Sequence, residues 1–172
     1  MAKLSQGAKA NMTGKIFENQ CKPLFEEYGF ILLDNAKYEK LKAKNQLPDK
    51  YVILNAPFTT IYNHKGKTEF VIVDNTLNKR IRVENKYQSA AGSVDEKYPY
   101  VLLNAIEAYP ENEIIIVIDG GGYKDGALEW IKTKVKDNWL DYKSTKKIEI
   151  MSIIEFNNWF FKTFSWLIML NI

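Results

Sequence analysis

The clearest pattern of hydrophobic and polar positions predicts a β-hairpin in the middle of the chain. Residues 68–73 and 79–86 are rich in β-branched side chains, and residues 75–78 between them, Asn-Thr-Leu-Asn, are typical of a turn. If this turn is a symmetric four-residue loop, Asp74 faces Lys79 and the rest of the hairpin pairs outward from them.

This register brings two carboxylates together. Counting outward from the turn, Glu69 lies directly opposite Glu84. The two-residue period of a strand places Lys86 and Gln88 on the same face as this pair. Asp74 lies an odd number of residues from Glu69, so it faces the other side of the sheet unless a bulge intervenes.

The rest of the pattern predicts an α/β fold in a single domain over residues 1–172, with a mixed central β-sheet flanked by helices and the cleft where the hairpin meets the first helix. Residues 113–118 are a nearly continuous apolar run, typical of a central strand covered on both faces. The other expected elements are a helix over 13–28, a charged segment over 34–50 with room for a short helix, an extended segment over 51–62, a helix from Pro99 to about Ala108, a helix near 125–139, a strand over 147–151 and a last helix that begins with the capping-box spacing of Ser152 and Glu155.

The paired carboxylates suggest a metal-dependent site. Like charges directly opposite each other destabilise a sheet, so we expect a cation to hold Glu69 and Glu84 together. Mg²⁺ fits best because it prefers oxygen ligands and is often bound by one or two carboxylates with water and phosphate oxygens; Mn²⁺ is the expected substitute. Lys86 is placed to orient or help deprotonate a water and to neutralise charge on a phosphate. Asp74 remains the alternative to Glu69 as the first carboxylate of this metal site. Taken alone, the Glu84-Asn-Lys86 triplet is better explained as charges on a solvated face.

The surrounding sequence favours a catalytic role for this triplet, because the chain resembles the PD-(D/E)XK nuclease superfamily, the restriction endonuclease-like fold. The resemblance rests on Gly14-Lys-Ile-Phe-Glu18, Thr68-Glu-Phe70, Glu84-Asn-Lys86 followed by Tyr87-Gln88, GSVDEKYP over 92–99 and EIIIVIDGGG over 113–122. It implies an α-β-β-β-α-β core in which Glu69 and Glu84 bind the metal, Lys86 serves the water and Glu18 of the first helix joins the site. The chain departs from the common pattern in having glutamate as its first acid, with no proline before it.

Three further residues and Gln88 are candidates around this centre. Gln88 is expected to hold the water or the scissile phosphate. Ser93, Asp95 and Lys97 lie in a turn before the helix at Pro99, where they contact phosphate or simply build the helix entry, and both interpretations stay open.

Composition removes several other classes of site. A single cysteine, Cys21, excludes a disulfide framework, and a single histidine, His64, in a turn-like run excludes His-Cys zinc sites and H-E-x-x-H chemistry. The net charge of +3 is too small to mark a strong polyanion binder by itself, so the lysine clusters are either a nucleic-acid groove or solvated faces. The N-terminal residues show no signal-peptide core, and a cytoplasmic location is expected.

The sequence thus predicts a Mg²⁺-dependent DNA endonuclease of restriction, phage or mobile-element type. The alternatives are an inert nucleic-acid-binding or assembly module of the same fold and an RNA-cleaving toxin nuclease. The aromatic C-terminal segment over 160–172 is too short for a transmembrane span of ~20 residues, so it is either a last core helix or the surface of a homodimer.

Overall fold

The computed structural model describes residues 6–89, 93 and 95–165. In chain order its elements are α1 (Gln6–Glu27), β1 (Ile31–Leu33), α2 (Asn35–Ala43), β2 (Lys50–Thr59), β3 (Lys65–Asp74), β4 (Lys79–Tyr87), the short 3₁₀ helix η1 (Asp95–Lys97), α3 (Tyr98–Leu103), the π-helical turn η2 (Asn104–Ala108), β5 (Glu113–Asp119), α4 (Asp125–Lys136), the 3₁₀ segment η3 (Trp139–Ser144), β6 (Lys147–Met151) and α5 (Ile153–Phe164).

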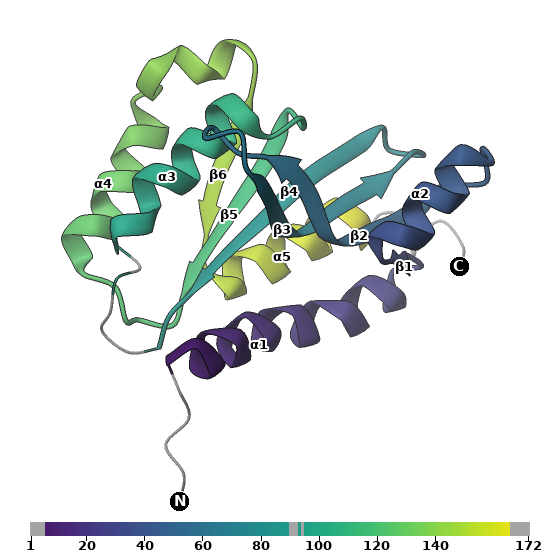
Figure 1. The fold of residues 1–172 in the computed structure, drawn as a ribbon, viewed down its shortest axis with the longest axis horizontal. Coiled ribbons are helices and arrows are strands. Elements are labelled where there is room, and N and C mark those ends of the chain that lie inside the picture. The colour runs from purple at the N-terminus through teal and green to yellow at the C-terminus, as the bar shows by residue number, and fades with distance from the viewer. Residues whose placement is uncertain (1–5, 90–92, 94, 166–172) are drawn as a thin grey trace, which may run out of the picture.

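The six strands form one mixed sheet in the order β1-β2-β3-β4-β5-β6. β2 pairs antiparallel with β3 and β3 antiparallel with β4, whereas the β1–β2, β4–β5 and β5–β6 pairs are parallel. Helices α1 and α5 cover one face, and α3 and α4 cover the other (Figure 1). The predicted α/β class is confirmed. The short helix α2 lies in the charged segment over 34–50, which was expected to have room for one, and the structure adds the strand β1.

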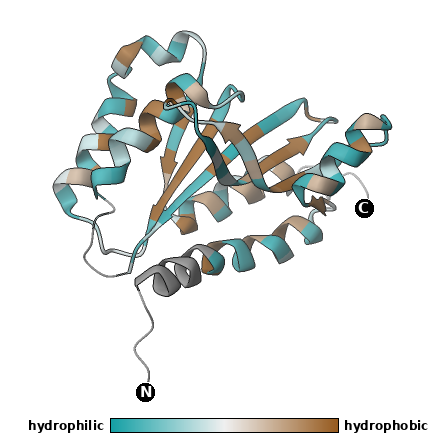
Figure 2. Cartoon of the chain, viewed as in Figure 1, coloured by the Kyte–Doolittle hydropathy of each residue, from teal (hydrophilic) through white to brown (hydrophobic). Residues whose placement is uncertain are grey.

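Among the described residues three hydrophobic clusters pack on the sheet, one beneath α1 and α5, one beneath α3 and α4, and a smaller one beneath α2. Ile115 and Val117 of β5 pack into the core beneath α1 and α5, and the alternate residues Ile114 and Ile116 pack into the core beneath α3 and α4. Both faces of β5 are therefore buried, which explains its unbroken apolar run. In Figure 2 the strands show long stretches of brown, the colour of hydrophobic residues, and the flanking helices show more teal, the colour of hydrophilic residues.

Helix α5 is mainly a core helix. Ser152 caps it, accepting from the Glu155 backbone N–H at 3.2 Å while the Glu155 carboxylate accepts from the Ser152 N–H at 2.7 Å, so the predicted capping box is confirmed. Phe156, Phe160 and Phe164 are buried against α1 and the sheet. Residues 166–172 of the aromatic segment lie outside the described residues. None of the described helices is both long and apolar enough to cross a membrane.

The β3–β4 hairpin has the predicted register and turn. Asp74 pairs with Lys79, and the ladder continues to Phe70 with Val83, one residue short of Glu69 and Glu84. Asp74 itself is buried, and its Oδ1 accepts from the backbone N–H groups of Thr76 at 2.9 Å and Leu77 at 3.2 Å. Asp74 therefore builds the turn at the far end of the hairpin from the carboxylate pair.

The glycine loop after β5 holds the end of β4. The Gln88 backbone N–H donates to the Asp119 carbonyl at 3.0 Å, and the Gly122 N–H donates to the Gln88 carbonyl at 2.7 Å. Gly120 has a φ of +98°, and a Cβ there would lie 2.4 Å from the Gln88 carbonyl oxygen. Only glycine allows this close approach. The loop therefore fixes the end of β4, the strand that contains the Glu84-Asn-Lys86 triplet.

Candidate active site

The predicted carboxylates and lysine come together on the sheet face that α3 covers. Glu84 and Lys86 lie beside Ile116 and Ile118 of β5, which pack in the core beneath α3 and α4. The expected placement of the cleft against the first helix is wrong, because Val83, between Arg82 and Glu84 in β4, is the residue that faces α1. Strand alternation then turns Glu84 and Lys86 to the opposite side.

Hydrogen bonds to Asn85 and Lys86 fix the positions of the two carboxylates, Glu69 and Glu84. The Glu69 Oε2 accepts from the backbone N–H of Asn85 at 2.6 Å, which carries the β3–β4 contact past the last ladder pair. The Lys86 ammonium forms an ion pair with Glu84 Oε1, and its Nζ also lies 3.3 Å from the Asn85 carbonyl oxygen. Glu84 is only 6% exposed. The Glu69 side chain and both ends of the triplet are thus fixed to one another.

The electrostatics of the pair favour a bound cation. Burial, followed by the negative charge of Glu84, raises the pKa of the Glu69 carboxyl to about 7, against the weaker opposing effects of Lys86 and the Asn85 N–H. Burial acts to lower the pKa of Lys86, but the charges of Glu84 and Glu69 outweigh it and hold this pKa above its ordinary value. Lys86 is therefore a persistent ammonium that neutralises part of the acidic pair.

The residues present fit a hard divalent cation. Glu84 Oε2 is buried and has no hydrogen-bond partner within the described part of the chain, although a buried carboxylate oxygen ordinarily has one. In that same part of the chain no cluster of three or more His, Cys, Asp or Glu side chains forms. Two carboxylates with water and substrate phosphate oxygens are the donor set that Mg²⁺ commonly takes, whereas a closed zinc site needs more protein ligands.

Two other predicted residues have different surroundings. Glu18 is partly buried on α1 and pairs with Lys22 at 2.6 Å, one turn along its own helix. Gln88 lies just past the end of β4, with its backbone held by the glycine loop. The roles of Glu18 and Gln88 in catalysis stay predictions.

The three residues of the predicted turn before α3 lie at the surface. Asp95 Oδ1 accepts from the backbone N–H of Lys124 at 3.2 Å, which ties η1 to the start of α4. Ser93 and Lys97 are exposed, and Lys97 directly precedes α3, which has Pro99 in its first turn. Helix entry at this point is as expected, and phosphate contact by these residues stays a prediction.

Sequence patterns gave no sign of the groups that surround the pair. Tyr109, at the end of η2, lies close enough to Glu84 that, after burial, the charge of this carboxylate raises the pKa of its phenol. The guanidinium of Arg82 lies 5.3 Å from the Tyr109 ring centroid and forms a buried ion pair with Glu111. None of these residues belongs to a motif, so only their proximity in the fold identifies them.

We expect metal binding to the metal-free protein to strengthen as pH rises towards 7. Because the pKa of Glu69 is raised to about 7, a proton occupies the carboxylate pair below that pH and must leave before a divalent cation can bind both acids. Affinity for Mn²⁺ or Mg²⁺ should change by up to about tenfold per pH unit below 7 and level off above it. Calorimetric titration at several pH values measures this.

The matched control for this titration is Glu69→Gln. This variant removes the group with the raised pKa, so its remaining metal affinity should be weaker and depend less on pH. Equal affinity of the wild-type protein at pH 5.5 and pH 8 would contradict the shared proton.

Comparison with known proteins is consistent with this geometry. A family model described as a PD-(D/E)XK nuclease superfamily domain matches residues 9–164. No curated protein and no solved structure matches the chain.

Proposed function

The chain belongs to the PD-(D/E)XK nuclease superfamily, and from this premise we propose that it is a Mg²⁺-dependent endonuclease that hydrolyses phosphodiester bonds in DNA. The observation that carries the proposal is the convergence of Glu69, Glu84 and Lys86 at the end of the β3–β4 ladder, with one carboxylate oxygen of Glu84 buried and unpartnered among the described residues. We further propose that it is of restriction, phage or mobile-element type and acts in the cytoplasm.

Each residue has a distinct role in the proposed reaction. Glu69 and Glu84 hold the metal, which when bound polarises the phosphate and lowers the pKa of a water molecule. Lys86 orients the attacking water and neutralises charge that builds on the phosphate. Because neighbouring carboxylates hold the pKa of Lys86 above its ordinary value, its charged form is favoured and it acts as a hydrogen-bond donor. This narrows the sequence-based role, which also included removing a proton from the water.

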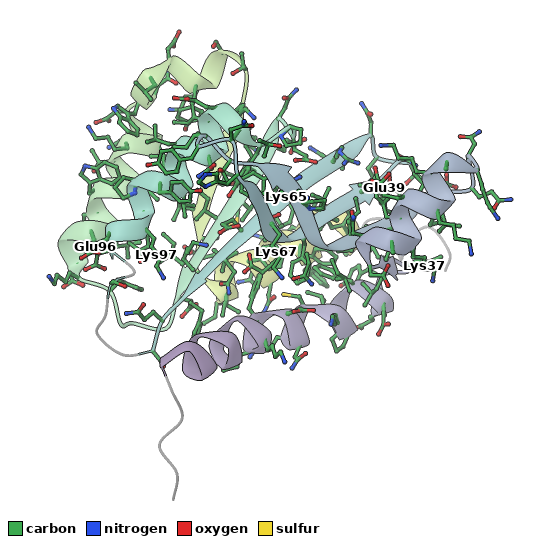
Figure 3. All side chains as sticks on the ribbon, viewed as in Figure 1. Lys37, Glu39, Lys65, Lys67, Glu96 and Lys97 are labelled. Carbon is green, nitrogen blue, oxygen red and sulfur yellow. The ribbon has the colours of Figure 1, made fainter. Side chains whose placement is uncertain are left out.

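The substrate path is proposed from the exposed cations near the site. Lys67 on β3 lies two residues before Glu69, and Lys97 lies at the start of α3; both are exposed and are labelled in Figure 3. We propose that Lys97 contacts phosphate together with Ser93, and that Asp95 positions this turn through Lys124. Gln88 is proposed to complete the site. A role for Glu18 stays a prediction, because α1 covers the face of the sheet opposite to Glu84 and Lys86.

Cleavage of both strands of a duplex would require two copies of the site. The proposed homodimer would use the outer face of α5, where Ile154 and Phe161 are 72% and 53% exposed. The other aromatic residues of this helix are divided between the core and its margin, which leaves a small apolar surface for the contact.

One observation favours the alternative of an inert nucleic-acid-binding module. Lys86 already supplies a cation to Glu84, so the pair is partly neutralised with no metal. Glu69 and the second oxygen of Glu84 lack such a charged partner in close contact within the described residues. Burial, followed by the charge of Glu84, still raises the pKa of Glu69 to about 7 despite the charge of Lys86. A metal-free assembly role gives no reason to retain this destabilising arrangement.

The test is incubation of the wild-type protein with supercoiled plasmid, linear duplex DNA and single-stranded RNA, each with Mg²⁺ or with a chelator. We expect nicked or linear plasmid only with Mg²⁺, and intact RNA. Failure to cut any of the substrates with Mg²⁺ or Mn²⁺, or cleavage that survives the chelator, would overturn the proposal. Preferential cleavage of RNA would replace it with the RNA-nuclease alternative.

A further inference from the structure

At the tip of the β2–β3 hairpin, the exposed Tyr62 stacks on Tyr100 of α3, and the two rings are called the tyrosine platform. The ring centroids of Tyr62 and Tyr100 are 5.3 Å apart with an interplanar angle of 22°, so the rings are stacked. Tyr62 is nevertheless 64% exposed, more than the outward-facing Phe161 of α5. Tyr100 lies against one face of the Tyr62 ring, and the His64 ring lies near it with centroids 6.5 Å apart and an interplanar angle of 62°, yet the Tyr62 residue keeps most of its surface open to solvent.

The platform is held in a fixed place. The Ile61 backbone N–H donates to Asn104 Oδ1 at 3.1 Å, and Asn104 Nδ2 donates to the Tyr100 carbonyl at 2.7 Å. Asn104 is 1% exposed and joins the hairpin tip to the helical layer. Within the tip, the Thr60 backbone N–H donates to the His64 carbonyl at 2.9 Å. The tyrosine that carries the open face is therefore pre-positioned, with little freedom left to lose on binding.

The platform adjoins the candidate active site. Tyr100 is among the groups whose charge acts on the pKa of Lys86, after the larger effects of burial and the two glutamates. The hairpin tip leads directly into β3, in which the exposed Lys67 lies two residues before Glu69, a separation of roughly 7 Å along a strand. The hairpin tip and the positive charge of Lys67 thus both lie on the chain segment that leads to Glu69.

A purely structural role does not account for the open ring surface. A tyrosine that only fastened the tip to α3 would be expected to bury most of its ring, and Asn104 already makes that connection through its hydrogen bond from the Ile61 backbone N–H. Exposed aromatic rings beside cationic side chains are the arrangement on which proteins stack unpaired bases, because every base has a π-face and the cations follow the backbone.

We propose that the open face of Tyr62 stacks an unpaired nucleobase of the strand that enters the site, so that the preferred substrate contains a single-stranded, flapped or bulged segment. This inference rests on the proposed function, because it names the substrate class of the same site. Tyr62 is a binding residue in this arrangement, and Tyr100 positions it.

The test is fluorescence anisotropy of short labelled single-stranded DNA, single-stranded RNA and blunt duplex DNA with the full chain in the presence of a chelator. The wild-type protein should bind a single strand more tightly than the blunt duplex. Tyr62→Ala should weaken single-strand binding by about tenfold and leave duplex binding within about twofold, because loss of one stacked base has an effect of this order. Tyr62→Phe should bind like the wild-type protein.

A second variant separates stacking from folding of the hairpin tip. Tyr62→Leu keeps apolar bulk over Tyr100 but has no π-face, so it should melt near the wild-type temperature and still bind the single strand as weakly as Tyr62→Ala. Stronger binding of RNA than DNA, with the same loss in Tyr62→Ala, supports the inference and identifies the strand as RNA. Unchanged single-strand binding in Tyr62→Ala, or an equal loss for single strand and duplex, overturns it.

These outcomes are distinct from those that test the nuclease proposal. A protein that binds single strands through Tyr62 but cuts nothing with Mg²⁺ or Mn²⁺ keeps this inference and loses the proposed activity. A protein that cuts plasmid while Tyr62→Ala binds all strands as the wild type does keeps the activity and loses this inference.

Discussion

Glu84→Gln is expected to lower Mg²⁺-dependent plasmid cleavage by about 10²–10³-fold or more, because it removes one charge from the proposed metal site at its most buried position. A rate loss of this size corresponds to about 3–4 kcal/mol of lost transition-state stabilisation. Glutamine keeps the shape of the side chain, so the fold should survive. Lys86→Ala should lower the rate as well, since the attacking water loses its hydrogen-bond donor and the phosphate loses a neutralising charge. Gel-based rates at saturating Mg²⁺ measure both effects.

Asp74→Asn is the matched control for these variants. Asp74 is the other carboxylate considered as the first metal ligand, yet it caps the far turn of the same hairpin and pairs with Lys50 at 3.5 Å. The amide still has an oxygen to accept the turn hydrogen bonds, so this variant should cleave at nearly the wild-type rate. Wild-type cleavage by Glu84→Gln, or an equal loss of cleavage in a folded Asp74→Asn, would refute the assignment.

Glu111→Gln is expected to lower the free energy of unfolding by about 3 kcal/mol, because it leaves the Arg82 guanidinium as an uncompensated buried charge. Arg82 also donates to the Thr68 hydroxyl at 2.9 Å and the Ala56 carbonyl at 3.1 Å, so it joins β2, β3 and β4 next to the site. Urea denaturation followed by circular dichroism measures the change.

The control for the unfolding experiment is Glu113→Gln. Glu113 pairs with Lys79 at 2.8 Å, but both side chains are about one-third exposed, so loss of this pair should change the free energy of unfolding by less than about 1 kcal/mol. Equal losses of unfolding free energy in the two variants would show that the buried Arg82–Glu111 pair contributes no more to stability than the exposed Lys79–Glu113 pair.

Local patterns were sufficient to predict much of the fold. The hairpin register follows from alternation and a four-residue turn, and the structure has the same pairing from Asp74–Lys79 to Phe70–Val83. The capping box at Ser152 and the covered strand β5 also follow from short-range chemistry. By contrast, the three-residue strand β1 is too short for its pattern to stand out, and it is a strand because it pairs with β2.

That Glu69, Glu84 and Lys86 share one face follows from the sequence alone, because strand periodicity and turn length are local properties of the chain. Which helices cover that face depends on tertiary packing, since the sheet has two apolar sides and alternation alone does not say which one α1 takes. The same holds for Tyr62 with Tyr100 and for Arg82 with Glu111, pairs from separate elements that no motif links. Their contacts depend on how the helical layer packs on the sheet, and this packing is set by the summed burial of many distant side chains.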